Sequence, residues 1–302
     1  MEYLINGIRG FCMALADSVP GVSGGTIAFI LGFYDKFINS LDDLVFGNKE
    51  KKKKAISFLI KLALGWIIGF IIATLILTSL FESQIYKVSS VFMGFIIFSI
   101  PLIIREEKNS LKGKHQNLIF TIIGIAIVAL ITYFNPVSGD GNLVDVSNLN
   151  LGLVLYVFVA AMIAISAMVL PGISGSTLLL IFGLYIPIMS SVKELIHFNL
   201  NALPVLIIFG LGVITGIILV IRLIKLALKK YRSQTIYCII GLMIGSLYAI
   251  IMGPTTLKIP QSPMDFATFS IIYFIIGGII VIGLEKIKAI LESKNMNEVK
   301  SE

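Results

Sequence analysis

Apolar runs long enough to cross a bilayer recur along the whole chain and limit what it can fold into. One of them, AISFLIKLALGWIIGFIIATLILTSLF, covers residues 55–81. A bilayer core about 30 Å thick needs about 20 such residues per helix. Of the 302 residues, 57% are hydrophobic and 14% are charged. The runs lack the apolar–polar alternation of a transmembrane strand, so the sequence predicts an all-α polytopic membrane protein.

The charged connections predict how the chain is threaded through the membrane. The predicted spans are 55–80, 88–104, 117–134, 203–221, 236–252 and 266–284. Basic residues gather in the loops expected at 49–54, 105–115 and 222–232 and in the tail from residue 286. Short basic loops stay on the cytoplasmic side, so we expect these connections and both termini in the cytoplasm. The net charge of +7 therefore reflects orientation and not nucleic-acid binding.

A Pro-Gly-x-Ser-Gly break interrupts the apolar sequence twice. The first copy, PGVSGGTIAFILGFY, begins at Pro20, and the second, PGISGSTLLLIFGLY, begins at Pro171, 151 residues later (171 − 20). Further matches follow at a shift of 147, for example Gly65 with Gly212. Chance similarity of glycine-rich helices is an alternative explanation for the later matches but hardly for the first window. The similarity predicts an internal repeat with halves 1–150 and 151–302. In the first window the matching positions of the first copy are Pro20, Gly21, Ser23, Gly24, Thr26, Gly32 and Tyr34.

Each half is predicted to hold a re-entrant helical hairpin followed by three transmembrane helices. The first hairpin, 3–46, enters from the cytoplasmic side, and the second, 151–198, enters from the outer side. Because three spans is an odd number, the second half is inverted relative to the first. Inverted-topology repeats with broken helices are the architecture of many secondary transporters. Whether the hairpin arms stop at the midplane or cross fully is left open.

The two breaks are the candidate binding site. Proline ends a helix, and the helices expected to begin near Gly24 and Gly175 present free N–H groups and a positive dipole end. Such ends bind anions without a lysine, although each serine has the alternative role of a simple helix cap. The predicted phosphate-binding residues are Gly21, Ser23, Gly24, Gly25 and Thr26 in the first tip and Gly172, Ser174, Gly175, Ser176 and Thr177 in the second.

Two ionisable residues accompany the first break. Asp17 has no acidic counterpart, since Met168 occupies the matching position. An ionisable group at membrane depth is a functional candidate, and Asp17 is predicted either to carry a proton or to pair with Arg9. Arg9 lies about 15 Å below the break at 1.5 Å per residue. It is predicted to anchor the inner interface or to contact a headgroup.

An enzymatic role is considered because GVSGG matches the nucleophile elbow G-x-S-x-G. The second copy, GISGS, does not match. The two histidines, His115 and His197, are expected away from the tips, so a serine nucleophile lacks its base. No cluster with metal-ligand spacing is present in the sequence. We therefore expect no enzyme activity, no metal and no cofactor, with a membrane-embedded phosphatase or other hydrolase as the alternative from another class.

The segments ADSVPGVSGGTIAFILGFYDKFI and LPGISGSTLLLIFGLY resemble the bacterial polyprenyl-phosphate transporter (PopT) family. The resemblance covers essentially the whole chain. It implies a flippase that moves undecaprenyl phosphate from the outer to the inner leaflet of the bacterial cytoplasmic membrane and so recycles the carrier of envelope precursors. Its implied partners are the lipid substrate and membrane lipids, and a homo-oligomer is left open. The family motif maps onto Asp17, Ser18, Pro20, Gly21, Ser23, Gly24, Gly25 and Thr26.

A different cargo is the main alternative to the lipid. The same two tips would suit a secondary transporter of a small water-soluble anion or ion, and the sequence does not separate the two. A lateral opening for a lipid tail would favour the first, and a cavity open only to water the second. A scaffold for envelope enzymes predicts instead that substitutions at Gly21, Ser23 and Thr26 leave transport unchanged.

Overall fold

A computed structural model describes residues 2–17, 23–72, 78–134, 144, 146, 150–196, 198–256 and 260–300, and the regular elements of this part of the chain are helices. The elements of the first half are α1 (Glu2–Asp17), α2 (Gly24–Ile30), α3 (Tyr34–Phe46), α4 (Lys49–Ile72), α5 (Thr78–Glu106), α6 (Lys108–Leu111), η2 (His115–Asn117) and α7 (Leu118–Tyr133). Those of the second half are α8 (Leu151–Val169), α9 (Gly175–Ile181), α10 (Tyr185–Ile196), η3 (Leu200–Ala202), α11 (Leu203–Lys230), α12 (Arg232–Met252), η4 (Gly253–Thr256) and α13 (Ile271–Lys300).

The helices have the length and composition of a multi-pass membrane protein. Within the described residues, six are long and apolar enough to cross a membrane, and the bent pair of α9 and α10 would make a seventh. The spans carry large apolar side chains on their outer surface, for example Ile67, Ile122 and Leu219, as lipid contact requires. The prediction of an all-α polytopic membrane protein is confirmed. The six helices cover Lys49–Ile72, Gln84–Glu106, His115–Tyr133, Leu151–Val169, Leu200–Lys230 and Arg232–Thr255.

Two basic segments predicted as loops are helical. Residues 49–54 form the first turns of α4, and α11 continues through the basic stretch as far as Lys230. The loop prediction was wrong because lysine, arginine and glutamate are good helix formers, so charge alone does not end a helix that has left the bilayer. At its other end α4 is described as far as Ile72; residues 73–77 of the predicted span lie outside the described residues, and α5 begins at Thr78.

The helix at the last predicted span begins later than predicted, and its apolar part, Ile271–Gly283, is shorter than the six long apolar helices. Residues 266–270 precede α13, which starts at Ile271. The Asp265 carboxylate accepts the backbone N–H groups of Ala267 and Thr268 at 3.0 and 2.9 Å. An aspartate that bonds the backbone just after itself favours a turn over a helix, which explains the shorter helix.

Each predicted hairpin contains three helices, because its second arm is bent. The bend separates α2 from α3 in the first hairpin and α9 from α10 in the second, where the two helices meet at 110°. Gly32 and Gly183 lie at these bends with φ of 67° and 66°, a left-handed conformation that glycine adopts without strain. Both belong to matching positions of the two sequence copies, so the match extends to backbone conformation.

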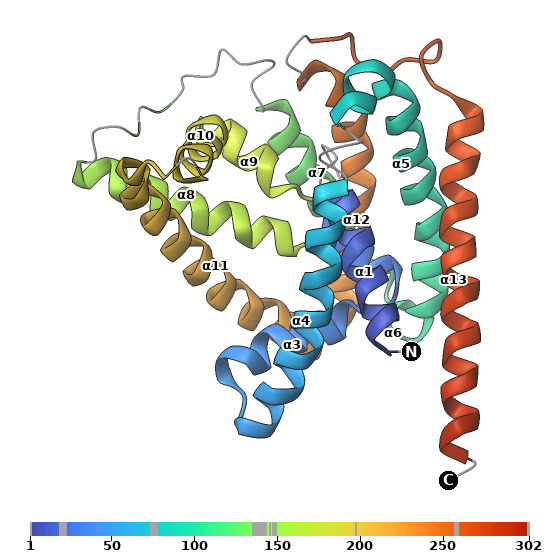
Figure 1. The fold of residues 1–302 in the computed structure, drawn as a ribbon. Helices are drawn as coiled ribbons and strands as arrows, with labels where there is room; N and C mark the ends of the chain where they lie inside the picture. Colours follow the sequence, from blue (N-terminus) through green and yellow to red (C-terminus); the bar gives the residue numbers. More distant parts are fainter. Residues whose placement is uncertain are drawn as a thin grey trace.

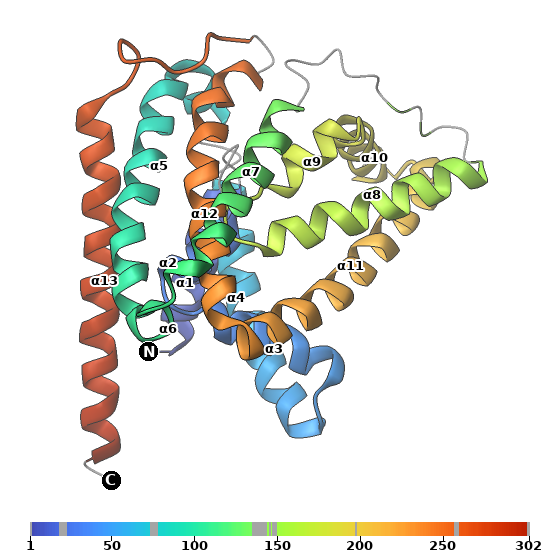
Figure 2. The same ribbon diagram turned by 180° about the vertical axis from the view of Figure 1, so that it is seen from behind.

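Four helix pairs pack side by side and form most of the structure. They are α1 with α4, α8 with α11, α5 with α13, and α7 with α12. Figure 1 shows α13 along α5, and Figure 2 shows α7 against α12 from behind. The first two pairs lie within one half of the sequence each. In the other two, the third span of each half packs against the second span of the other half, so the halves exchange helices.

The packing contacts of glycines in the two halves correspond. A Cβ on Gly65 would collide with the Gly7 carbonyl oxygen, and one on Gly212 would collide with that of Phe158. These positions match at the shifts of 147 (212 − 65) and 151 (158 − 7). The pattern recurs in the exchanged pairs, where Gly124 faces Cys238 and Gly277 faces Val91. Such contacts support the interpretation of an internal repeat.

The contact at Gly65 leads to a test of stability. We expect Gly65→Ala to lower the free energy of unfolding by about 1–3 kcal/mol, because the added methyl group meets backbone that cannot move aside. Gly210→Ala is the matched control, since a Cβ on this glycine of α11 meets nothing within 4 Å. Thermal unfolding of the two purified variants in the same detergent measures the difference. Equal melting temperatures would show that the α1–α4 contact is looser than described.

Candidate functional site

The two sequence breaks meet inside the molecule. The Ser23 hydroxyl donates to the Leu170 carbonyl oxygen at 3.1 Å, and the Gly172 N–H donates to the Thr26 hydroxyl at 2.8 Å. Close by, the Tyr34 hydroxyl donates to the Val169 carbonyl oxygen at 3.2 Å. These bonds join residues 135 to 147 positions apart in the chain. The hairpin tips are thus in direct polar contact.

Several hydrogen-bond donors at the first tip are engaged. The Asp17 carboxylate accepts the Gly24 N–H at 2.6 Å and the Trp66 indole N–H at 2.9 Å. Ser23 caps α2 by accepting the Thr26 N–H at 3.3 Å, and both side chains are buried. A carboxylate therefore already occupies the place at the start of α2 where an anion is expected, and the cap predicted for Ser23 is present.

The second tip is arranged differently. Ser174 precedes α9 but makes no side-chain cap hydrogen bond, and its hydroxyl lies 2.8 Å from that of Ser176. Ser176 and Thr177 are half-buried, whereas Thr26 is fully buried. Gly172 has φ of 89° and packs against Leu242. The two tips therefore share a sequence pattern but not a hydrogen-bond pattern.

Two glycines allow the first tip to close. A Cβ on Gly24 would lie 2.8 Å from the Asp17 carboxylate, and one on Gly25 would lie 2.7 Å from the Val169 carbonyl oxygen. Real Cβ atoms do not come that close, so a larger residue at Gly25 has to move the second tip. Gly25 and Gly175, predicted as phosphate-binding residues, thus also have packing roles; a Cβ on Gly175 would lie 2.9 Å from the Ala164 carbonyl oxygen.

Asp17 and Arg9 have separate surroundings. Arg9 donates to the Asn6 side-chain oxygen at 3.1 Å and lies 4.8 Å from the centre of the Phe33 ring. The partner of Asp17 that sequence reasoning missed is Trp66. The signal was available, because Trp66 is the chain's one tryptophan and a buried indole N–H requires an acceptor. Gly21, Ser18 and Pro20 lie outside the described residues.

A serine hydrolase mechanism needs a base such as histidine beside the serine of a tip. His115 belongs to η2, between α6 and α7 and not in a tip, and His197 lies outside the described residues. Among the residues that the structure does describe, no group of three or more His, Cys, Asp and Glu side chains is placed to hold a metal ion.

Broken helices that meet within a bundle of apolar spans define a class of protein, the multi-pass membrane transporters built around discontinuous helices. Comparison with known proteins agrees with this class. Residues 13–268 match the model of the undecaprenyl phosphate translocase-like family, and the chain belongs to that family. No solved structure matches the chain.

Two curated relatives are similar over nearly their whole length. A protein of Staphylococcus aureus named polyprenyl-phosphate transporter is 38% identical over 292 residues, which cover 94% of this chain and 97% of the relative. A protein of Vibrio cholerae with the same name is 29% identical, with 95% and 97% covered. Both relatives are named as transporters and not as enzymes.

Proposed function

We propose that this chain transports polyprenyl phosphate across the bacterial cytoplasmic membrane, from the outer to the inner leaflet. The family and the names of both relatives support this cargo. The direction follows from the resemblance to carrier-recycling transporters. The basic segments at the start of α4, in α6 and at the α11–α12 junction lie toward one end of the molecule (Figure 1), which supports a cytoplasmic location of that end.

The observation that carries the proposal is the polar contact between the tips. Only the phosphate of the lipid has to cross the apolar core, because the isoprenoid tail can stay in lipid. Burying a bare charge in hydrocarbon costs many kcal/mol, and the hydroxyls and backbone N–H groups of the tips offer replacement for water. The groups nearest the contact are those of Ser23, Thr26 and Gly172.

In the described arrangement the tips are closed against each other, and Asp17 helps to hold them in this state. In it the carboxylate holds the Gly24 N–H and the tips bond to each other. The phosphate enters when the tips separate and Asp17 releases that N–H group, by moving or by taking up a proton. The tips then open toward one leaflet and later toward the other, as in alternating access. Ser174, Ser176 and Thr177 of the less engaged second tip are available for the first contact.

Reconstitution in liposomes tests the proposal. The purified protein is expected to flip polyprenyl phosphate between leaflets faster than empty vesicles do, with a rate that responds to a pH step. The unphosphorylated polyprenol is the control cargo and should not respond. Flip no faster than in empty vesicles, together with uptake of a small soluble anion, would favour the alternative of a water-soluble cargo. Release of inorganic phosphate from the lipid would favour the hydrolase.

A further inference from the structure

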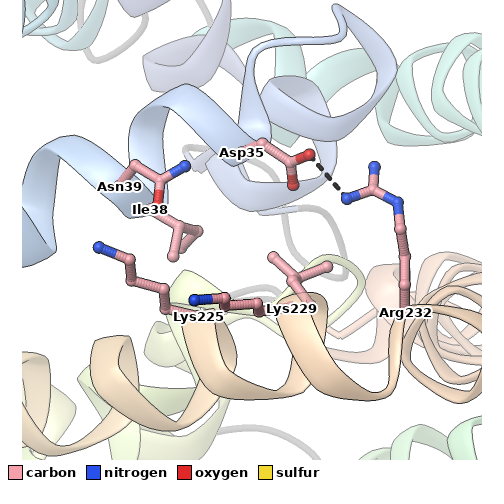
Figure 3. A pocket seen from close by; sticks show the side chains of 7 residues that line it. Asp35, Ile38, Asn39, Lys225, Lys229 and Arg232 are labelled. Atoms are coloured by element: carbon pink, nitrogen blue, oxygen red, sulfur yellow. Dashed lines mark hydrogen bonds and ion pairs between the residues drawn. The ribbon is translucent and has the colours of Figure 1, made fainter.

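A second concentration of polar groups lies away from the tips, where α11 meets α12. Two hollows flank Arg232 there, one of about 190 Å³ and one of about 360 Å³, and both are lined by Arg232 and Lys229. Figure 3 shows the smaller one, with Lys225 and Lys229 on α11 opposite Asn39 of α3. We call the two hollows the basic groove, after the cations that line it: Lys114, Lys225, Lys229, Lys230 and Arg232.

Part of this charge is balanced by carboxylates. Arg232 pairs with Asp35 at 2.9 Å and with Glu107 at 2.5 Å, and Lys225 pairs with Asp42 at 2.5 Å. Burial tends to raise the pKa of Glu107, but the hydrogen bonds from Arg232 and Ser110 and the charge of Arg232 outweigh it and lower that pKa. Glu107 therefore stays ionised at neutral pH and keeps its hold on Arg232.

The larger hollow retains uncompensated positive charge. Four cations line it, Lys114, Lys229, Lys230 and Arg232, and no carboxylate does. Within the part of the chain that the structure describes, Lys114 and Lys229 take part in no ion pair. Lysine ammonium groups around a polar hollow are suited to phosphate oxygens, whereas the Arg232 guanidinium is engaged by Glu107 and Asp35.

The buried part of the lining of the larger hollow is polar and held by a hydrogen bond. Asn117 and Ser233 line it with exposed fractions of 7% and 3%, and the Asn117 side-chain N–H donates to the Ser233 hydroxyl at 2.9 Å. This bond fixes both side chains on the two elements that face each other, η2 and α12. Such a polar lining suits a hydrated or phosphorylated headgroup better than a hydrocarbon tail.

An apolar stripe leads along α11 to the groove. Leu219, Leu223 and Leu226 are exposed and spaced by four and three residues, so they lie on one face of the helix. Lys230, four residues after Leu226, continues this face at the groove. A molecule with a long apolar tail can therefore lie along α11 and place a charged head among the lysines, which favours a lipid over a free ion.

From these features we infer that the basic groove binds the phosphate monoester headgroup of a lipid. The choice of lipid rests on the proposed function, which would make the groove the place where the transported headgroup is held at the cytoplasmic end. The phosphate chemistry rests on the groove alone and would serve inorganic phosphate equally, so the experiment has to separate these two sources.

Competition with lysine labelling tests this inference in the full-length protein in nanodiscs. An amine-reactive reagent is applied with polyprenyl phosphate, with polyprenol or with inorganic phosphate, and the labelling rate of each lysine is read by mass spectrometry. With polyprenyl phosphate at about ten times its Kd, about a tenth of the sites stay free, so labelling of Lys114 and Lys229 should slow roughly tenfold. Lys51 and Lys52, exposed on α4, are internal controls and should not change.

Each outcome of the labelling decides the inference. Protection of Lys114 and Lys229 by polyprenyl phosphate and not by polyprenol supports it. Protection by inorganic phosphate alone rejects the lipid and leaves a site for a soluble phosphate. No protection, or equal protection of all four lysines, overturns it.

A pair of charge-matched variants adds a functional measurement. Lys114→Gln with Lys229→Gln should raise the concentration of polyprenyl phosphate that half-saturates binding by roughly tenfold, since two exposed charge contacts are lost. Lys51→Gln with Lys52→Gln removes the same charge and should leave binding unchanged. Equal binding by both variants would overturn the inference. Flip above empty vesicles by the wild-type protein would then still support the proposed function. Failure of the groove inference can therefore be distinguished from failure of the proposed function.

Discussion

Gly25→Ala is expected to lower the rate of polyprenyl-phosphate flip by roughly tenfold or more. The added methyl group would lie 2.7 Å from the Val169 carbonyl oxygen, and relieving that overlap pushes the second tip away from the first. The tips then lose the hydrogen bonds that Ser23 and Thr26 make across the contact. Overpacking typically costs about 1–3 kcal/mol, and each 1.4 kcal/mol corresponds to about a factor of ten. The measurement is the initial flip rate in liposomes at equal protein density.

A control in the same hairpin separates tip closure from general damage. Gly7→Ala, on α1, adds the same methyl group where nothing lies within 4 Å, and it should flip lipid at the wild-type rate. The comparison requires that both variants elute as single species and melt within a few degrees of the wild type. If Gly25→Ala is folded and transports normally, close contact of the tips is not part of the transport cycle.

Asp17→Asn should abolish the response of flip to a pH step and reduce the basal rate by roughly tenfold. The amide keeps one acceptor oxygen, but its NH₂ group would face either the Gly24 N–H or the Trp66 indole N–H, both of which donate to the carboxylate. A buried donor left without an acceptor costs about 1–3 kcal/mol. The variant also cannot exchange a proton at this position. Flip is measured in liposomes with the pH changed on one side at a time.

Asp43→Asn provides the charge-matched control for this experiment. Asp43 lies in the same hairpin, on α3, and its substitution removes one negative charge away from the tips. This variant should keep both the rate and the pH response of the wild-type protein. Normal flip by Asp17→Asn at every pH and membrane potential would rule out proton coupling through Asp17 and leave it the role of holding Gly24 and Trp66.

The sequence was sufficient for the class of fold and for the location of the tips. Apolar runs of about 20 residues have one stable outcome in lipid, so the polytopic helical fold followed directly. The breaks at Ser23 and Ser174 were visible because proline and glycine interrupt those runs. The contact between Thr26 and Gly172 joins segments far apart in the chain, and only the interpretation as an internal repeat suggested it.

Other features depend on information that local patterns do not contain. The lysine run at 49–54 is helical although its charge predicts a loop, because such a charge signal indicates orientation and not irregular backbone. The bend at Gly32 needs a left-handed residue, and a single glycine in an apolar run does not reveal whether it serves a bend or close packing. The partnership of Trp66 with Asp17 spans 49 residues and depends on how α1 and α4 pack.

The exchange of third spans changes which parts of the molecule can move as bodies. α7 packs on α12, and α13 packs on α5. A rotation of either half of the sequence would therefore also move a helix of the other half. The natural dividing line separates this interlocked four-helix frame from the two hairpin-and-span units, α1–α4 and α8–α11. The bonds of Ser23 and Thr26 to the second tip, together with the contact of α3 with α11, join these two units, so a separation of the tips would have to change the α3–α11 contact as well.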